Sequence, residues 1–404
     1  MSVQEQNRQD SQISAPRRWS MLGLGVVAQT AGGVFANAPA FLIPTLHGEH
    51  GMSLARAGLI AAAPTVGFLV SLFAWGLVVD RIGERRVLVL GHGAAALASA
   101  VAAALGTSFV ALGVLLFLCG MAASSANAAS GRVVVGWFPA HRRGFAMGVR
   151  QMALPLGVAV AALTIPSLAA DHGIGWALAL PAAIGAVAAL ACLLFVVDPP
   201  RPTRADASEQ GLLTNPYRNQ SVLWRIHTVS AALVVPQYLV WTFALVWLMT
   251  DRHWSAASAG ILITVTQLLG AAGRIGAGIW SDRVGSRMGP LRTVAIAAAL
   301  SMAALAVTDW LDSPAAVALM VVASVITVAD NGLAFTAVAE IAGPYWSGRA
   351  LGAQNTGQYL AAAFVPPVFG AVIGTLGFPV AFALAALCPL ASAPLVPADP
   401  QPSA

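Results

Sequence analysis

The chain has 404 residues, of which 58% are hydrophobic and only 9% are charged. A soluble fold of this length cannot bury so much apolar surface, so the composition indicates a protein whose solvent is lipid. The net charge of +5 includes no lysine, and the arginines stand in short clusters between apolar stretches. This pattern reports membrane topology and argues against a nucleic-acid partner.

Twelve apolar segments along the chain are long enough to cross a bilayer. They are predicted at 19–46, 53–79, 87–106, 109–136, 144–169, 175–197, 224–249, 256–281, 290–308, 314–341, 348–374 and 378–397. The first run is too long for a signal-peptide core and is expected to remain as an anchor. The sequence predicts an all-α membrane protein with two six-helix bundles, 19–197 and 224–397, a polar linker at 198–223, and tails at 1–18 and 398–404.

The arginines are divided unequally between the two sets of loops. Sixteen lie in the first tail, in the linker and in the loops that follow the second, fourth, eighth and tenth spans. The loops on the other side of the membrane hold only Arg56 and Arg252. Because arginine-rich short loops stay in the cytoplasm, both termini and the linker are predicted to be cytoplasmic, in an inner or plasma membrane.

One loop sequence occurs twice, half a chain apart. Residues of "GLVVDRIGER" recur in "GIWSDRVGSR" at an offset of 202: Gly76, Asp80, Arg81, Gly83 and Arg85 correspond to Gly278, Asp282, Arg283, Gly285 and Arg287. A second repeat, at an offset of 204, relates Gly144, Ala146 and Gly148 to Gly348, Ala350 and Gly352. Small residues at this spacing allow close helix packing. The two halves are therefore expected to be a duplicated, pseudo-symmetric bundle, as in many secondary transporters.

The pattern Gly-x-x-x-Asp-Arg-x-Gly-x-Arg-Arg after a second membrane helix resembles the cytoplasmic loop motif of the major facilitator superfamily. The first copy is complete through Arg86, and the second has Met288 at the last basic position. The resemblance covers the chain after the first tail and implies the fold of that family. It also implies gating roles for Gly76, Asp80, Arg81, Gly83, Arg85, Arg132, Asp282 and Arg283. The alternative is that these charges only set topology.

Asp80 and Asp282 are expected at the cytoplasmic ends of the second and eighth helices. A carboxylate there can hold the positive end of a neighbouring helix or pair with a loop arginine, closing that side of the protein.

Departures from family patterns narrow the substrate class. Leu116 stands where an arginine is expected ahead of Gly120, and the glycine-proline signature of drug antiporters is incomplete around Pro155. Both departures weaken the interpretation as an efflux pump. The glycine signatures of nitrate porters are also missing, so the sequence does not support nitrate as the substrate.

Two of the sixteen acidic residues fall within predicted spans, Asp330 and Glu340. Glu340 lies near the cytoplasmic end of the tenth helix and can face water. Asp330 lies near the middle of that helix, where an unpaired carboxylate is costly. It is predicted to line the cavity and to load and release a coupling proton. A structural hydrogen bond, involving Asn331 or a nearby helix, is the competing interpretation.

Three arginines also lie within predicted spans. Arg132 is expected to join the latch with Asp80, whereas Arg150 and Arg274 can hold an anionic group; snorkelling or pairing between helices is the alternative. Uncharged polar side chains complete the predicted binding surface, although each is equally suited to join helices. The predicted substrate-binding set is Arg150, Arg274, Asn127, Gln151, Gln237, Tyr238, Asn331, Gln354, Asn355 and Gln358.

The sequence therefore predicts a secondary active transporter for a small organic solute, with coupling to protons as the preferred mechanism. An anion is favoured because intramembrane arginines outnumber acids. The alternatives are proton-driven efflux of amphipathic compounds and a membrane sensor that binds without transport. No enzyme is predicted, since His92 and His227 are isolated and no catalytic or metal-ligand cluster stands out. The expected partners are a small-molecule substrate, protons and lipid, with no cofactor, for a monomeric protein.

Overall fold

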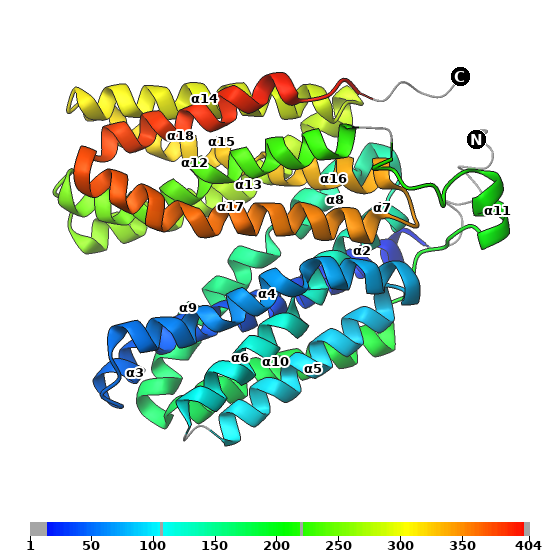
Figure 1. The fold of residues 1–404 in the computed structure, drawn as a ribbon, viewed down its shortest axis with the longest axis horizontal. Coiled ribbons are helices and arrows are strands. Elements are labelled where there is room, and N and C mark those ends of the chain that lie inside the picture. Colours follow the sequence, from blue (N-terminus) through cyan, green and yellow to red (C-terminus); the bar gives the residue numbers. More distant parts are fainter. Residues whose placement is uncertain (1–13, 106–107, 219–220, 400–404) are drawn as a thin grey trace. The chain divides into compact units, whose positions relative to one another are not determined.

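A computed structural model describes residues 14–105, 108–218 and 221–399. The predicted tails 1–18 and 398–404 therefore lie largely outside the described residues. The chain is helical throughout (Figure 1). The elements of its first part are α2 (Ala15–Asn37), η1 (Ala38–Leu42), α3 (Ile43–Gly48), α4 (Leu54–Ile82), α5 (Glu84–Ala104), α6 (Phe109–Ala123), α7 (Ser125–Trp137), α8 (Ala140–Arg150), α9 (Ala153–His172), α10 (Ile174–Phe195) and α11 (Arg204–Glu209). Those of the second part are α12 (Val222–Thr250), α13 (Ala256–Val284), α14 (Met288–Trp310), α15 (Ala315–Thr327), α16 (Asp330–Ala342), α17 (Ser347–Leu376), α18 (Phe378–Ser392) and η2 (Ala393–Leu395).

Twelve helical stretches of the described chain are long and apolar enough to cross a membrane. This confirms the all-α class and the number of spans expected from the sequence. Five spans consist of more than one element. α2 continues through η1 into α3, and the pairs α6–α7, α8–α9, α15–α16 and α18–η2 each form one span.

The fourth and tenth spans are interrupted at corresponding positions. Ser124 separates α6 from α7, and Val328 and Ala329 separate α15 from α16, an offset of 204 in the sequence. Asp330 is consequently the first residue of α16. Asp330 lies near the middle of the span Ala315–Ala342, as expected, but the helix is interrupted immediately before it.

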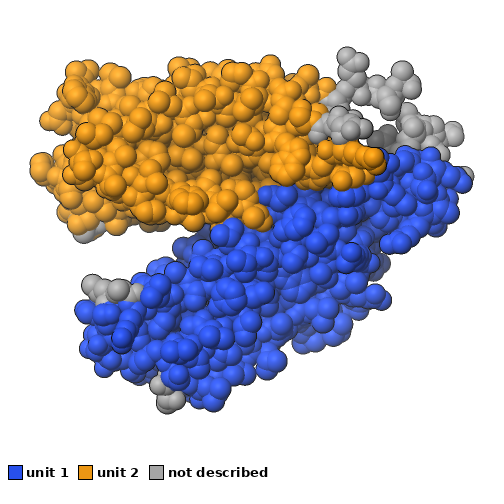
Figure 2. Space-filling view, in the orientation of Figure 1, with its two compact units in different colours: residues 1–139, 152–214, 343–353 blue, residues 140–151, 215–342, 354–404 orange. Residues whose placement is uncertain are grey.

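The described chain divides into two compact units, shown in separate colours in Figure 2. Unit 1 contains residues 1–139, 152–214 and 343–353, and unit 2 contains residues 140–151, 215–342 and 354–404. Each unit thus includes a short segment from the other sequence half. In both segments the small residues of the second repeat begin a membrane span.

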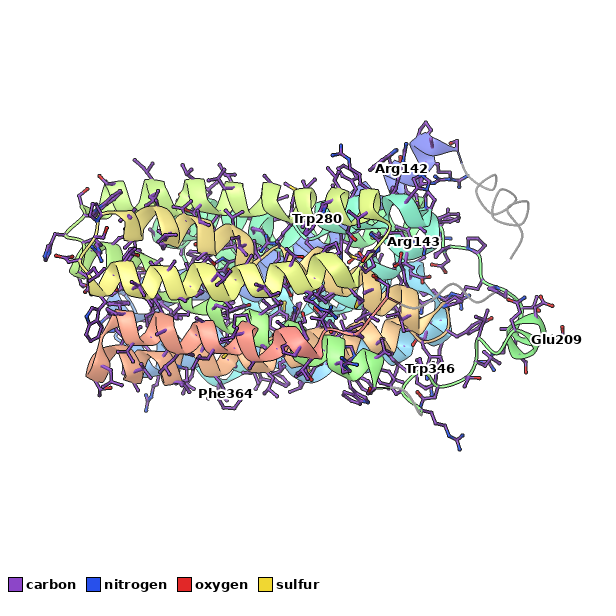
Figure 3. The ribbon with its side chains drawn as sticks, turned by 90° about the horizontal axis from the view of Figure 1, so that it is seen from above. Arg142, Arg143, Glu209, Trp280, Trp346 and Phe364 are labelled. Carbon is purple, nitrogen blue, oxygen red and sulfur yellow. The ribbon has the colours of Figure 1, made fainter. Side chains whose placement is uncertain are left out.

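Each unit has its own apolar core. In unit 1, one core cluster gathers side chains of α2, η1, α4, α6, α9 and α10, including Leu42, Leu112 and Ile165. In unit 2, a cluster around Trp247 and Phe382 joins α12, α14, α15, α17 and α18. Large apolar side chains are also exposed, such as Phe364 of α17, labelled in Figure 3. Exposed apolar side chains in this number fit a surface that faces lipid.

The linker 198–223 is more ordered than its composition indicated. It contains the short helix α11, whose first turn is capped by the Thr203 hydroxyl accepting from the Asp206 amide. Within unit 1, Trp346 Nε1 donates to the Leu213 carbonyl at 3.1 Å, and the Tyr345 hydroxyl donates to the Pro202 carbonyl. These bonds hold the first part of the linker against the loop that precedes α17.

Candidate transport site

The Asp80 carboxylate at the end of α4 is a hydrogen-bond acceptor for the start of α17. Oδ1 accepts from the Gly348 amide at 2.9 Å, and Oδ2 accepts from the Arg349 amide at 3.0 Å. Oδ2 also pairs with Arg349 Nε at 2.8 Å, and Oδ1 pairs with the Arg132 guanidinium. The carboxylate therefore binds both the positive amino-terminal end of a helix and two arginines.

A second buried carboxylate extends this cluster. Glu84, the first residue of α5, is fully buried and pairs with Arg132 Nε at 2.8 Å. Arg201 of the linker binds both Glu84 oxygens at 2.9 Å and donates to the Asp80 carbonyl at 3.0 Å. Sequence reasoning used Arg201 and Arg349 only to count charges and did not single out Glu84. The useful signal was an acidic residue directly inside the arginine-rich motif.

Asp282 repeats the backbone contact in unit 2. Its two oxygens accept from the amides of Gly144 at 3.0 Å and Phe145 at 2.8 Å. The ion pair differs from that of Asp80, because Arg287, from the loop that follows α13, supplies the guanidinium at 2.7 Å. Arg287 also pairs with Glu340 at 3.2 Å, and Arg143 approaches Glu340 at 3.3 Å. Glu340, which was expected to face water, is thus held by two arginines.

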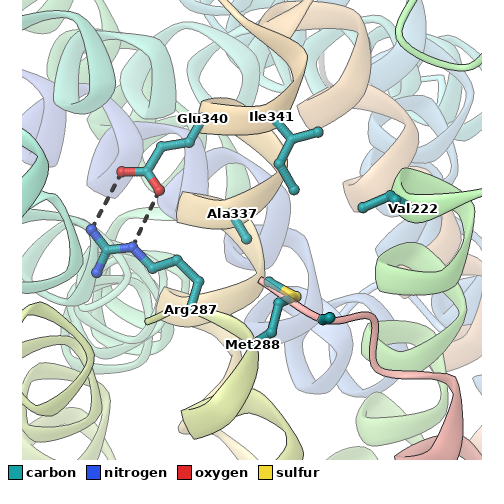
Figure 4. Close-up of a pocket in the computed structure, with 7 residues that line it drawn as sticks. Val222, Arg287, Met288, Ala337, Glu340 and Ile341 are labelled. Carbon is teal, nitrogen blue, oxygen red and sulfur yellow. Dashed lines mark hydrogen bonds and ion pairs between the residues drawn. The ribbon is translucent and has the colours of Figure 1, made fainter. Parts of the chain in front are cut away.

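The Arg287–Glu340 pair lines a cavity of about 580 Å³ in unit 2, shown in Figure 4. Its other walls are apolar and come from Val222, Met288, Ala337, Ile341 and Ala398. The two dashed contacts in Figure 4 use both carboxylate oxygens of Glu340, which leaves that group engaged by arginine. The cavity therefore offers no free charge to a ligand.

Glycines permit the close approach of backbone at both motif aspartates. A methyl group at Gly348 would lie 2.6 Å from the Gly76 carbonyl oxygen and 2.6 Å from Asp80 Oδ1. One at Gly144 would lie 2.5 Å from the Gly278 oxygen. The duplicated glycines of the two repeats therefore meet in pairs, 76 with 348 in unit 1 and 278 with 144 in unit 2.

The remaining predicted gating residues are placed differently. Gly83 has a φ of 92° and Gly285 a φ of 67°, so both turns use backbone angles that glycine adopts at low cost. Arg85 donates through Nε to the Leu193 carbonyl at 3.0 Å, and its amide donates to Asp198 at 2.6 Å. The side chains of Arg81 and Arg283 are exposed, and neither side chain forms a hydrogen bond or salt bridge with another described residue.

Asp330 is completely buried in unit 2. Its Oδ2 accepts a hydrogen bond from the Ser230 hydroxyl at 3.2 Å, whereas Oδ1 has no partner among the described residues. The sequence had offered Asn331 or a nearby helix as a structural partner, and the observed donor comes from α12. A single hydroxyl compensates little of the cost of burying an ionised carboxylate.

Arg150 and Arg274 are also buried in unit 2. The Arg150 guanidinium lies 5.6 Å from the centre of the Phe335 ring and donates to Gln151 Oε1 at 2.6 Å. The Arg274 guanidinium lies 5.8 Å from the Trp241 ring. Aromatic faces therefore provide part of the surroundings of both guanidinium groups.

Small residues bring the backbones of these helices together. A methyl group at Gly148 of α8 would lie 2.8 Å from the Arg274 carbonyl oxygen, and one at Gly332 of α16 would lie 3.6 Å from the same oxygen. Helices α8, α13 and α16 therefore pack closely against one another in unit 2. Arg150 lies on α8, Arg274 on α13 and Asp330 on α16.

Amide side chains form a connected network beside Asp330. Gln358 Nε2 donates to the Ser230 hydroxyl at 2.7 Å and to Asn331 Oδ1 at 3.0 Å. Asn331 Nδ2 in turn donates to Gln237 Oε1 at 3.2 Å. Three predicted binding residues thus bond to one another, which is the interhelical role that the sequence left open for each.

His227 is not isolated, contrary to the sequence-based expectation. It lies on α12, where Nδ1 contacts Gln354 Oε1 and Nε2 contacts the Tyr217 hydroxyl at 2.9 Å. The contact between Tyr217 and His227 could not be predicted from their spacing. Tyr217 lies in the linker, which has no helical periodicity from which its position could be inferred.

Nine of the ten predicted substrate-binding residues belong to unit 2, and Asn127 belongs to unit 1. Asn127 Oδ1 accepts from Gln29 Nε2, and Gln29 Oε1 accepts from the Ser130 hydroxyl at 3.0 Å. In unit 2, Asn355 is buried, and Tyr238 packs against Trp241 with ring centres 5.5 Å apart.

The fold and these paired motifs define a multi-pass membrane protein of the duplicated secondary-transporter class. A family model of the Major Facilitator Superfamily matches residues 24–366 and 238–403. The chain belongs to this superfamily. Because the family and the relatives below are transporters, the protein is a transporter and not an enzyme.

Relatives and a solved structure agree with this assignment. The chain is 52% identical over 382 residues to "Uncharacterized MFS-type transporter Rv2994" of Mycobacterium tuberculosis, covering 94% of this chain and 85% of the relative. It is 24% identical to a hexuronate transporter of Bacillus subtilis, covering 60% and 59%. It is 25% identical to the probable sulfoacetate transporter SauU of Cupriavidus necator, covering 83% and 82%. The proton:xylose symporter XylE has the same fold, with a TM-score of 0.73, 15% identity, and coverage of 96% and 97%.

Proposed function

We propose that the protein moves a small organic anion across the cell membrane by alternating access, coupled to protons. The observation that carries this proposal is the presence of two buried arginines and one buried carboxylate on closely packed helices of unit 2. The binding set is the one expected from the sequence, and the protein is taken to act as a monomer with both termini in the cytoplasm.

Asp330 is the proposed proton carrier. Its side-chain hydrogen-bond donor is Ser230, and no salt bridge of the described residues joins it to an arginine. Burial without an ionic partner favours the neutral acid, whereas access to water favours the carboxylate. A group whose surroundings alternate between these conditions binds and releases one proton in each cycle.

Arg150 and Arg274 are the proposed anion ligands. Each presents a planar group of N–H donors that matches the geometry of carboxylate or sulfonate oxygens. Arg150 and Arg274 are both buried in unit 2, where two guanidinium groups near each other favour the binding of an anion. The two distant relatives named for hexuronate and sulfoacetate support the same substrate class, since both compounds are organic acids.

Asp80 and Asp282 are the proposed gating residues. Each binds two consecutive backbone amides from the opposite sequence half, at 2.9 and 3.0 Å for Asp80 and at 3.0 and 2.8 Å for Asp282. These bonds are polar and lie at the ends of spans, so water can replace them when they open. Alternating access then requires that they form in one state and break in the other.

The test uses purified protein in lipid vesicles with an imposed pH gradient. Radiolabelled D-glucuronate and sulfoacetate are offered to the native protein and to Asp330→Asn, which keeps the size of the side chain but cannot ionise. We expect the gradient to accelerate uptake of at least one anion by the native protein and not by the variant. Gradient-driven uptake that persists in Asp330→Asn would remove Asp330 from coupling, and binding without uptake by the native protein would favour a sensor.

A further inference from the structure

A buried polar stripe runs along one face of α12 in unit 2. His227, Ser230 and Gln237 recur at spacings of three and seven residues, which places them on the same side of a helix. All three are buried. Their partners are Gln354 and Gln358, one turn apart on α17, and Asp330 and Asn331 of α16. The stripe therefore connects the surroundings of Asp330 with His227, one helical turn nearer the linker.

The contacts of His227 fit both a neutral and a protonated ring. Gln354 Oε1 is an acceptor, so in the observed orientation Nδ1 carries a hydrogen and Nε2 accepts from the Tyr217 hydroxyl. If Nε2 also gains a proton, it donates to the same phenol oxygen, because a hydroxyl is both donor and acceptor. No hydrogen-bond partner has to be lost when the ring becomes charged.

Tyr217 connects this histidine with the linker, outside the membrane span. Its ring stacks on His227 with centres 5.9 Å apart and an angle of 26°, and it lies 5.2 Å from the Trp224 ring. Burial raises the pKa of Tyr217 to about 12, so the phenol stays neutral at physiological pH. Tyr217 is thus a permanent hydrogen-bonding group at the outer end of the stripe.

Two buried polar atoms lie on the path between Asp330 and His227 without a partner in the described part of the chain. They are Asp330 Oδ1, an acceptor, and Gln354 Nε2, a donor. Buried polar groups are normally satisfied by protein or by ordered water, and a single water molecule can serve an acceptor and a donor at once. Ser230, which donates to Asp330, and His227 lie three residues apart on α12, about one helical turn or about 5 Å along the helix axis.

Asp330 is the acid available to exchange a proton with His227, because the other acidic groups on the elements around α12 are paired with arginines. The elements that contact α12 carry Asp330, Glu340, Arg274, Asp282, Arg283, Arg292 and Asp309, and α12 itself carries Arg225. Glu340 and Asp282 pair with Arg287, and Asp309 pairs with Arg252. Arg225 donates to the Leu395 carbonyl at 2.7 Å.

We propose that His227 is a second proton-carrying residue, which receives the proton released by Asp330 and passes it to water beside Tyr217. This inference rests on the proposed proton coupling. In the transfer, the O–H bond of the Asp330 carboxyl breaks, a water molecule carries the proton, and an N–H bond forms at Nε2, because Nδ1 already carries a hydrogen in the observed orientation. The imidazolium then loses one proton from Nε2 to water on the linker side. One proton moves, and the ring is neutral before and after.

The first experiment separates net proton movement from substrate movement. Vesicles carrying native protein, His227→Asn or Tyr217→Phe are tested with radiolabelled D-glucuronate and sulfoacetate, for uptake driven by a pH gradient and for exchange at equal pH. We expect gradient-driven uptake to fall about tenfold in His227→Asn and less in Tyr217→Phe, which keeps the ring stack but loses the hydroxyl. Exchange should change less than about twofold, because it needs no proton to leave Asp330.

His253→Asn is the matched control. This histidine lies outside the spans with a φ of 57°, a conformation that asparagine tolerates, and it should leave both measurements unchanged. If His227→Asn transports under a gradient as well as the native protein while Asp330→Asn does not, the relay is wrong and the coupling proposal stands. If uptake by the native protein ignores the gradient, the coupling proposal itself fails.

A second measurement needs no substrate. The Trp224 and His227 rings meet edge to face with centres 5.9 Å apart, so a charge appearing on the imidazole changes the fluorescence of Trp224. The difference between the native emission and that of Trp224→Phe isolates this residue. We expect its pH titration to show one step that disappears in His227→Asn and persists in His253→Asn. A flat titration in the native protein would show that His227 never gains a proton and would overturn the proposal.

Discussion

Asp80 accepts two hydrogen bonds from Arg349, one from the backbone amide at 3.0 Å and one from Nε at 2.8 Å. Its counterpart Asp282 accepts from the Phe145 amide at 2.8 Å, but phenylalanine provides no side-chain charge. The two copies of the motif therefore share a backbone contact and differ in their ion pairs. In unit 1 the arginine that pairs with the motif aspartate comes from the start of α17, whereas in unit 2 it comes from the aspartate's own loop.

This difference predicts unequal effects of removing the two carboxylates. Asp80→Ala leaves Arg349 without a carboxylate partner and the buried Arg132 with Glu84 alone, and we expect a loss of about 3 kcal/mol in the free energy of unfolding. Asp282→Ala leaves Arg287 still paired with Glu340, so a loss of about 1 kcal/mol is expected. Thermal unfolding in detergent measures both variants, and equal losses would contradict the asymmetry.

A pair of glycines two residues apart on α13 tests the close approach of backbones. A methyl group at Gly278 would collide with the Gly144 carbonyl and lie 3.0 Å from the Phe145 amide, whereas no described atom lies within 4 Å of one at Gly276. We expect Gly278→Ala to destabilise the protein by about 2 kcal/mol through overpacking. Gly276→Ala should be neutral or stabilise it by up to about 1 kcal/mol, because alanine favours helix. Unfolding temperatures that shift alike would refute the contact.

The sequence predicted the features that depend on local pattern. Long apolar runs predicted the twelve spans, and the repeated Asp-Arg loops predicted a duplicated fold, because both signals lie within short stretches of residues. The interruption before Asp330 could not be predicted, since "VITVADNGLAF" contains no proline and reads as one continuous apolar helix. Whether such a helix breaks depends on neighbours that satisfy the exposed backbone groups, and these neighbours are distant in sequence.

The candidate site shows the same division. Asp330, Arg150 and Arg274 were found because a charge within an apolar span is conspicuous. Glu84, Arg201 and the Tyr217–His227 contact were missed, since their meaning depends on which helices and linker segments meet. The sequence also contains a repeated Asp-Pro pair that marks the start of two helices. Asp198 and Asp399 each precede a proline at an offset of 201, and each accepts from backbone amides that begin α5 or α14.

The cap at Asp399 predicts a pH dependence of stability. Burial tends to raise the pKa of Asp399, but hydrogen bonds from Ser286 and from the amides of Met288 and Arg287 outweigh it and hold this pKa below its usual value. A lowered folded-state pKa stabilises the protein above the unfolded value of about 3.9, and this stabilisation is lost as the pH falls toward the folded value. We expect Asp399→Asn to be less stable than the native protein above about pH 5, and we expect this difference to shrink as the pH falls below the unfolded value of about 3.9. Unfolding temperatures across this range provide the measurement, and a constant difference would argue against the cap.

Arg274 provides the sharpest test of the proposed anion site. Its guanidinium lies over Trp241 and its Nε has no hydrogen-bond partner among the described residues, so donors remain available to a ligand. Lysine keeps the charge but loses the planar pair of donors and the stacking on the indole. We therefore expect Arg274→Lys to weaken binding of the transported anion about tenfold, which corresponds to about 1.4 kcal/mol. Arg142→Lys, an exposed change in the same unit (Figure 3), should leave binding unaltered. Titration calorimetry in detergent gives the dissociation constants. Equal affinity in native and Arg274→Lys protein would mean that the site needs only a positive charge there, and loss in both variants would point to a general charge effect rather than to a bound guanidinium.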